Sequence, residues 1–297
     1  MISYFQAIVI GLLQGVTELF PISSLGHSVL VPAWLGWDHL VTAQSADESF
    51  YLAFVVALHV ATAVALLVYF RAEWVRIIAG FVRTWRTRRI ETPDERLAWL
   101  LVVATIPAGI TGLALEHALR TLFAKPLAAA VFLTVNGLVL LAGERVRRRA
   151  AVRHLVVAHA TDRGPGEEEG RALDTLDFKE AGAVGIAQIG ALFAGVSRSG
   201  ITMVAGLLRG LDHEDAARFS FLLATPIIFA AGVYKVPDLA GHLGDGIRGQ
   251  ALVGALFAGV AAFVSVRFLV RFFQTRTLLP FAVYSLIVGA ISIIRFA

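Results

Sequence analysis

Long apolar segments follow one another along the chain, separated by short polar or basic stretches. Six of them have the length and apolarity of a transmembrane helix, which needs about 20 residues to cross a typical bilayer. These segments cover roughly residues 50–70, 97–116, 126–143, 217–235, 250–272 and 278–296. The pattern therefore predicts an all-α polytopic membrane protein with six transmembrane spans.

Two further apolar segments, near residues 5–33 and 180–209, are each interrupted at the centre by Gly, Ser or Pro. We interpret both as re-entrant helix pairs. Non-helical backbone at membrane depth finds no hydrogen-bond partner in lipid, so it is tolerated only where protein buries it or where it lines a polar cavity. The two breaks are therefore the predicted location of a functional site.

Composition supports this fold class and excludes others. The chain of 297 residues is 57% hydrophobic and 16% charged, whereas soluble domains carry roughly 45–50% apolar and about 25% charged residues. The absence of cysteine excludes disulfides, thiolate metal sites and a cysteine nucleophile. The first basic residue is Arg71, so the N-terminus lacks the charged region of a cleaved signal peptide and we expect the first apolar segment to be retained.

The net charge of +4 comes from basic residues beside the apolar segments, so no nucleic-acid partner is expected. Basic residues favour cytoplasmic loops. One cluster lies between the first two spans and consists of Arg71, Arg76, Arg83, Arg86, Arg88, Arg89 and Arg96; a second follows the third span and consists of Arg145, Arg147, Arg148, Arg149 and Arg153. Both fall on one side only if the 5–33 segment makes no net crossing and both termini lie outside.

The two halves of the chain share a sequence pattern at a constant offset of 174. Ala7, Gly11, Gln14, Ser23 and Gly26 correspond to Ala181, Gly185, Gln188, Ser197 and Gly200. Each half holds one re-entrant unit and three spans, and an odd number of crossings inverts the second half. We predict a single membrane domain, 1–297, with a first inverted repeat at 1–143, a cytoplasmic linker at 144–179 and a second repeat at 180–297. Such repeats place a substrate site near the bilayer midplane.

The first break reads QGVTELFPISSLGH from Gln14 to His27. Gln14 and Glu18 are four residues apart and share one helix face. Pro and Gly within the break let the chain turn and bring Ser23, Ser24 and His27 near that face. Ionisable groups are costly within a membrane and indicate function by default. The alternative is that Glu18 is only a structural hydrogen-bond partner.

The second break reads AGVSRSGIT from Ala194 to Thr202. Arg198 cannot deprotonate, and its planar fork matches phosphate oxygens in a bidentate fashion. The helix that follows would point free N–H groups at the same place. The candidate phosphate-binding residues are Ser23, Ser197, Arg198, Ser199, Gly200 and Thr202. The alternative is that Arg198 merely pairs with Glu18 as a structural ion pair.

Other polar residues carry less weight. His59 lies within a predicted span, and we interpret it as a buried, hydrogen-bonded residue rather than a ligand. Asn136 is interpreted as an interhelical contact. No histidine in the chain forms a recognisable metal-ligand spacing.

Together these motifs resemble the undecaprenyl-diphosphatase family of the bacitracin-resistance type. The first is similar to the family's (E/Q)GxTExxPxSSxGH signature and the second to its PGxSRSGxT signature, while FSFLLATP from Phe219 to Pro226 also resembles a shared stretch. The resemblance covers essentially the whole chain. Ala194 stands where the family usually has Pro, Leu25 where it often has Thr, and Gln14 where many members have Glu.

The resemblance implies hydrolysis of undecaprenyl pyrophosphate to the monophosphate and inorganic phosphate. It implies recycling of a lipid carrier for peptidoglycan synthesis, bacitracin resistance, and a site in the bacterial inner membrane reached from the outer face. A divalent cation, Mg or Ca, is implied as cofactor, with Glu18 as its candidate ligand. The expected nucleophile is Ser24, and the expected general acid/base is His27, which Glu18 would orient. Arg198 would stabilise negative charge on the phosphate, and Gln14 would be a supporting residue of the site. A water nucleophile remains an alternative.

A second hypothesis is a transporter or flippase for a phosphorylated lipid or a small anion. The inverted repeat is common in transporters, and Arg198 could bind an anion without chemistry. The enzyme is favoured because a carrier needs no serine and histidine beside the anion. The oligomeric state stays open, with a homodimer as one alternative.

Overall fold

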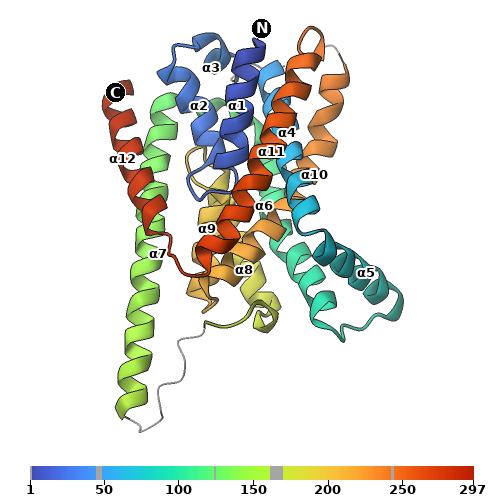
Figure 1. Ribbon diagram of the computed structural model, residues 1–297, viewed down its shortest axis with the longest axis vertical. Helices are drawn as coiled ribbons and strands as arrows, with labels where there is room; N and C mark the ends of the chain where they lie inside the picture. Colours follow the sequence, from blue (N-terminus) through green and yellow to red (C-terminus); the bar gives the residue numbers. More distant parts are fainter. Residues whose placement is uncertain (1, 45–48, 124, 161–169, 242–243) are drawn as a thin grey trace.

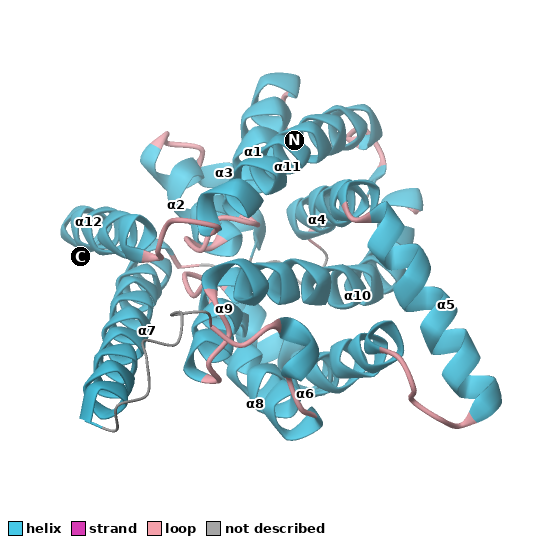
Figure 2. Ribbon diagram, turned by 60° about the horizontal axis from the view of Figure 1, so that its bottom comes forward, coloured by secondary structure: helices cyan, strands magenta, loops and turns pink. Residues whose placement is uncertain are grey.

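The computed structural model describes all residues except 1, 45–48, 124, 161–169 and 242–243 (Figure 1). The described residues form helices joined by turns and loops, and they contain no strand (Figure 2). The helices are α1 (Tyr4–Thr17), α2 (Ser24–Trp34), α3 (Asp38–Gln44), α4 (Phe50–Tyr69), α5 (Arg71–Thr87), α6 (Pro93–Phe123), α7 (Pro126–Ala160), α8 (Phe178–Gln188), α9 (Arg198–Leu208), α10 (His213–Ala240), α11 (Arg248–Phe273) and α12 (Leu279–Phe296), with short 3-10 turns at Leu173–Thr175 and Ile189–Leu192.

Six helices are long and apolar enough to cross a membrane, and they match the six predicted spans. They cover Phe50–Tyr69, Pro93–Leu115, Pro126–Arg149, His213–Val233, Arg248–Phe273 and Leu279–Phe296. The all-α polytopic fold class is confirmed. Helix α7 differs from expectation in its length, because it continues to Ala160 through part of the predicted linker.

The predicted helix pairs are present at both breaks, and each pair starts and ends at the same end of the molecule. Phe5 at the start of α1 contacts Trp37 just after α2, with ring centroids 6.4 Å apart. Arg171 before α8 forms a backbone bridge with Leu211 after α9. Both helix pairs are therefore re-entrant in shape.

Equivalent positions of the two pairs share their local geometry. Ser23 caps α2 by accepting a hydrogen bond from the Gly26 backbone N–H at 3.2 Å, and Ser197 caps α9 by accepting one from Gly200 at 3.1 Å. A serine oxygen at this position satisfies an N–H that lacks a helical partner. The division of the chain into two repeats stays a prediction, and these matched caps agree with it.

Two glycines of the repeat serve close helix packing. A Cβ at Gly11 would lie 2.3 Å from the backbone oxygen of Gly254 in α11. A Cβ at Gly185 would lie 2.5 Å from the backbone oxygen of Ala104 in α6. Only glycine allows the backbones to approach this closely, so each re-entrant helix packs directly on a span of the opposite half.

The two ends of the molecule differ in charge. Both termini lie at one end, at the top in Figure 1, while α5 and the foot of α7 lie toward the other. These two segments carry most of the basic residues of the predicted cytoplasmic clusters, and Arg88, Arg89 and Arg96 follow α5 in the chain. The arrangement is the one that the positive-inside rule requires for termini outside and clusters inside.

Candidate active site

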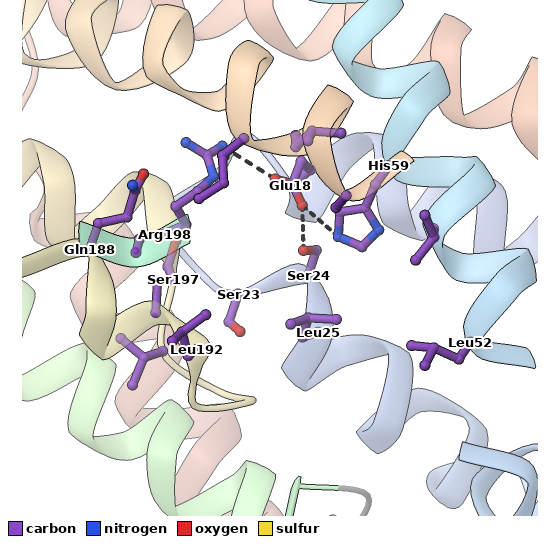
Figure 3. Close-up of a pocket in the computed structure, with 17 residues that line it drawn as sticks. Glu18, Ser23, Ser24, Leu25, Leu52, His59, Gln188, Leu192, Ser197 and Arg198 are labelled. Carbon is purple, nitrogen blue, oxygen red and sulfur yellow. Dashed lines mark hydrogen bonds and ion pairs between the residues drawn. The ribbon is translucent and has the colours of Figure 1, made fainter. Parts of the chain in front are cut away.

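The two breaks meet at a cavity of roughly 300 Å³ (Figure 3). Its polar lining residues are Glu18, Ser23, Ser24, His59, Gln188, Ser197 and Arg198. The first break, the second break and span α4 each contribute. Residues that lie up to 180 positions apart in the chain are thus brought together, as the breaks predicted.

Direct hydrogen bonds hold the two breaks against each other. The Gly195 backbone N–H donates to the Ser23 hydroxyl at 3.1 Å. Asn136 of α7 lies between the breaks, accepting from the Ser197 backbone N–H at 2.9 Å and donating to the Pro21 carbonyl at 2.9 Å. The interhelical contact predicted for Asn136 is therefore present, and it satisfies backbone groups that the breaks leave without helical partners.

Glu18 is the centre of the polar network. Its Oε2 accepts from the Ser24 hydroxyl at 2.5 Å and from Gln14 Nε2 at 3.1 Å, and it lies 3.2 Å from His59 Nε2. Its Oε1 lies 3.2 Å from Arg198 Nη2. The residue is only 7% exposed. A carboxylate this buried needs paired partners, and four side chains supply them.

The structure does not bring His27 to this network, so the prediction that it faces Glu18 is wrong. His27 Nδ1 donates to the Ser23 carbonyl at 2.7 Å, and Nε2 lies 2.9 Å from the Tyr284 hydroxyl. The ring stacks on Tyr284, with centroids 5.7 Å apart. It does so because the first turn of α2 directs the imidazole toward α12 rather than toward the cavity. The general acid/base role proposed for His27 loses its geometric basis.

His59 occupies the place expected for His27, as Figure 3 shows. Its Nδ1 donates to the Val55 carbonyl at 2.8 Å. Since a carbonyl only accepts, Nδ1 carries a proton, and Nε2 can donate to Glu18 when the ring is protonated. The interpretation of His59 as a hydrogen-bonded residue of a span is confirmed, but its place in the cavity wall beside Glu18 was not predicted. A signal was available, because the rule that ionisable residues in spans indicate function applies to His59 as it does to Glu18.

Arg198 lies at the first position of α9 and reaches both α10 and the first break. Its Nη1 donates to the Ser220 carbonyl at 3.1 Å, and its Nη2 pairs with Glu18. The ion pair weighed as an alternative is thus present. Arg198 Nε is buried, and among the described residues it has no hydrogen-bond partner.

Gln188 is a second lining residue that the sequence analysis did not assign to the site. It is buried, its Nε2 lies 3.4 Å from the Ala104 carbonyl, and its Oε1 has no hydrogen-bond partner among the described residues. The repeat offset could have identified it, since Gln188 corresponds to Gln14.

The remaining predicted phosphate-binding residues divide into two groups. Ser23 and Ser197 line the cavity, although their hydroxyls already cap α2 and α9. Ser199, Gly200 and Thr202 do not line it. Thr202 Oγ1 instead contacts the Arg198 carbonyl at 2.7 Å. This second group stabilises the start of α9 and does not provide ligands at the cavity wall.

Of the described residues, Glu18 alone brings a carboxylate to the cavity wall, and both of its oxygens have partners. Among the described residues, no group of three or more His, Asp or Glu side chains could hold a metal ion. Mg²⁺ is commonly bound by one or two carboxylates together with substrate phosphates and water. The residues present therefore fit a divalent cation only when substrate oxygens complete its coordination.

Comparison with known proteins gives matches along nearly the whole chain. Residues 7–291 match the family described as bacitracin resistance protein BacA. The chain is 59% identical to undecaprenyl-diphosphatase 2 of Frankia alni, with 100% of this chain and 98% of the relative covered. It is 57% identical to undecaprenyl-diphosphatase of Mycolicibacterium paratuberculosis over the same shares, and 42% identical to undecaprenyl-diphosphatase 2 of Chromobacterium violaceum over 97% of each chain.

Proposed function

The chain belongs to the bacitracin resistance protein BacA family, and from this premise we propose that the cavity around Glu18 is the active site of an undecaprenyl-diphosphatase. The enzyme hydrolyses undecaprenyl pyrophosphate to undecaprenyl phosphate and inorganic phosphate, and so returns the lipid carrier to cell-wall synthesis. The observation that carries the site assignment is the contact of one carboxylate, Glu18, with Ser24, His59 and Arg198 in a cavity between the two breaks.

Ser24 is the nucleophile in this proposal. Its hydroxyl proton already points at Glu18 Oε2 across 2.5 Å. The Ser24 oxygen attacks the terminal phosphorus, the bond from that phosphorus to the bridging oxygen breaks, and undecaprenyl phosphate leaves while Glu18 takes the proton. Water then attacks the phosphoserine, inorganic phosphate leaves, and the proton on Glu18 returns to the serine oxygen.

Arg198 and two helix N-termini bind the phosphates. Helices α2 and α9 both begin at the cavity wall, at Ser24 and Arg198. Helix N-termini favour anions through their free N–H groups and the helix dipole. The free Arg198 Nε–H adds a charge-assisted donor beside them. These groups stabilise charge on the phosphoryl oxygens during transfer.

The apolar wall of the cavity suits the isoprenoid part of the substrate. It consists of Leu25, Leu52, Val56, Ala108, Ala191, Leu192, Val196, Ile227, Ile228 and Ala231. Leu52 and Val56 belong to α4, and Ile227, Ile228 and Ala231 to α10, so the prenyl chain would lie between these two spans. Burial of apolar surface contributes about 25 cal/mol per Å².

We also propose that a divalent cation binds together with the substrate, held by Glu18 and pyrophosphate oxygens. Such a cation would neutralise phosphate charge. Chelation with EDTA should abolish phosphate release, and added Mg²⁺ or Ca²⁺ should restore it. Calorimetric titration of the cation into the protein alone should show little binding, since Glu18 offers the only carboxylate at the cavity wall. Tight binding without substrate would contradict a shared site.

The location in the inner membrane, with the site reached from the outer face, belongs to the same proposal. The first re-entrant pair enters from the end that holds both termini, opposite the basic clusters (Figure 1). The positive-inside rule places those clusters in the cytoplasm. Because the chain has no cysteine, single cysteines near Ser3 and in the linker can report their sides. Labelling of both by an impermeant reagent on intact cells would contradict this orientation.

Phosphate release from purified protein and undecaprenyl pyrophosphate tests the proposed chemistry. Ser24→Ala should lose nearly all turnover and should form no phosphoenzyme. Ser28→Ala is the matched control, since Ser28 lies one turn further along α2, does not line the cavity and donates to the Leu25 carbonyl. Normal turnover in Ser24→Ala would favour a water nucleophile. Transport without phosphate release by the native chain would favour the transporter alternative.

A further inference from the structure

Helix α5 (Arg71–Thr87) has no counterpart in the second half of the chain. In the first half it connects span α4 to span α6, whereas in the second half fewer than ten residues separate α10 from α11. Both views show α5 at the periphery of the molecule, projecting away from α7 and α12 (Figures 1 and 2). The helix is thus an addition to the duplicated scaffold and contributes no residue to the cavity.

One face of α5 is packed and the opposite face is apolar and exposed. Gly80 and Thr84 lie on the packed face, where Thr84 accepts a hydrogen bond from Trp99 of α6 at 2.9 Å. The exposed row consists of Val75, Ile78, Val82 and Trp85, which recur every three or four residues and range from 45% to 71% exposed. The row lies on one side of the helix because such spacings repeat each turn.

Unpaired arginines accompany this apolar row. Arg86, Arg88 and Arg89 are exposed, and within the described part of the chain none of them has a carboxylate partner. Arg76 and Arg83 pair with carboxylates at the start of α6 and just before it, Arg76 with Asp94 at 3.3 Å and Arg83 with Glu91 at 3.2 Å. The C-terminal end of α5 therefore carries surplus positive charge next to exposed apolar side chains.

We propose that α5 is a docking surface for anionic phospholipid headgroups of the leaflet on its side of the membrane. The row from Val75 to Trp85 enters the acyl boundary, while Arg86, Arg88 and Arg89 bind the headgroup phosphates. An amphipathic helix with arginines on its polar side and Trp and Val on its apolar side lies in the plane of such an interface. Charge complementarity favours anionic lipid over zwitterionic lipid.

An ion pair connects this surface to the catalytic cavity. Glu73 on the packed face of α5 accepts from Arg218 of α10 at 2.6 and 2.9 Å. Two residues later in α10, the Ser220 carbonyl accepts from Arg198. Anionic lipid that fixes α5 in the interface thus also fixes the segment of α10 that positions Arg198. Stability of the fold is the primary effect, and turnover follows it.

The test compares melting of the purified protein in nanodiscs of phosphatidylcholine with melting in nanodiscs that contain phosphatidylglycerol. The native chain should melt a few degrees higher with phosphatidylglycerol, and high salt should shrink this difference. The Arg86→Gln, Arg89→Gln double variant should melt as the native chain does in phosphatidylcholine but should gain little from phosphatidylglycerol. Phosphate release is not needed as a readout, so failure of the proposed chemistry would leave this result unaffected.

The matched control is the Arg271→Gln, Arg276→Gln double variant, which removes the same charge from the end of α11. It should keep the full response to phosphatidylglycerol. Equal loss in both double variants would overturn the proposal, because it would show a response to net charge rather than to α5. A spin label at Val82→Cys should collide with dissolved oxygen, and one at Arg89→Cys, beyond the end of α5, with a water-soluble nickel complex. Water exposure of both labels would likewise overturn the proposal.

Discussion

The two breaks share a backbone but differ in chemistry. At the offset of 174, the capping serines Ser23 and Ser197 correspond, whereas Glu18 corresponds to Leu192 and Ser24 to Arg198. In the proposed site, the first break thus supplies the carboxylate and the serine proposed as nucleophile, and the second supplies the arginine. The capping serines are repeated, and the residues proposed to act on the substrate are not. Each break therefore contributes a different part of one cavity.

The largest expected effect follows from the acidic residue that only the first break has. Glu18→Gln keeps the shape but removes the proton acceptor for Ser24 and the charge opposite Arg198 and His59. We expect turnover to fall by about 10²–10⁴, the range for a positioned acid or base. Steady-state phosphate release measures the loss. The control is Gln14→Ala, which removes one hydrogen bond to the same carboxylate and should cost far less.

The next largest loss of turnover is expected at Arg198, the positively charged residue of the second break. Arg198→Lys retains the charge but cannot reach the Ser220 carbonyl, Glu18 and a phosphate oxygen at once. We expect turnover to fall by about 10²–10³, with a smaller change in KM. Melting should be followed in parallel. If turnover were unchanged and only the melting temperature fell, Arg198 would be a structural partner of Glu18 and would not bind the phosphate.

Much of this comparison could be made from the sequence, because breaks, caps and close glycine contacts depend on local residue type. The two breaks, the six spans, and the pairing of Gln14 with Glu18 were all predictable. The choice between His27 and His59 was not. It depends on which neighbouring helix each imidazole meets, and a helix turns by about 100° per residue. His27 meets Tyr284 of α12, while α4 directs His59 to Glu18.

The two histidines provide a sharper test of the first break. His59→Gln should lower turnover by about 10–100-fold, as is typical of side chains that orient a catalytic group, because Glu18 loses a partner at 3.2 Å. His27→Gln should retain most turnover and lose stability, since the ring nitrogens of this buried residue bond to the Ser23 carbonyl and the Tyr284 hydroxyl rather than to Glu18. Phosphate release and melting of both variants show which histidine contributes to turnover and which to stability. A larger catalytic loss at His27 would restore the role first predicted for it.

The shared scaffold should respond alike in both halves. Gly11→Ala and Gly185→Ala would each press a methyl group against a backbone oxygen, and we expect each to cost about 1–3 kcal/mol of stability from overpacking. Turnover per folded molecule should change little. Gly109→Ala in α6 is the control, since no atom lies within 4 Å of its Cβ position. A strong response in only one half would mean that the packing is not equivalent.

The smallest effect is expected at the first helix of each pair. Both helices begin with a capping box, which is neutral at α1 and acidic at α8. Ser3 and Gln6 form the box at α1, and Asp177 and Glu180 form it at the equivalent positions of α8.

Arg171, 2.7 Å from Glu180, holds the pKa of this carboxyl below its ordinary value. A carboxyl whose pKa is lower in the folded chain stabilises the fold at pH values above its pKa in the unfolded chain, about 4.3. This contribution is lost as pH falls through the pKa of the folded chain.

Glu180→Gln keeps the box but removes the charge. It should therefore be slightly less stable than the native chain at pH 7, by about 1 kcal/mol or less for a pair near the surface, and the difference should disappear at a pH below the lowered pKa of Glu180. Gln6→Ala, which breaks the neutral box, should lower melting equally at both pH values. A pH-independent deficit in Glu180→Gln would show that the charge of Glu180 adds nothing to its cap.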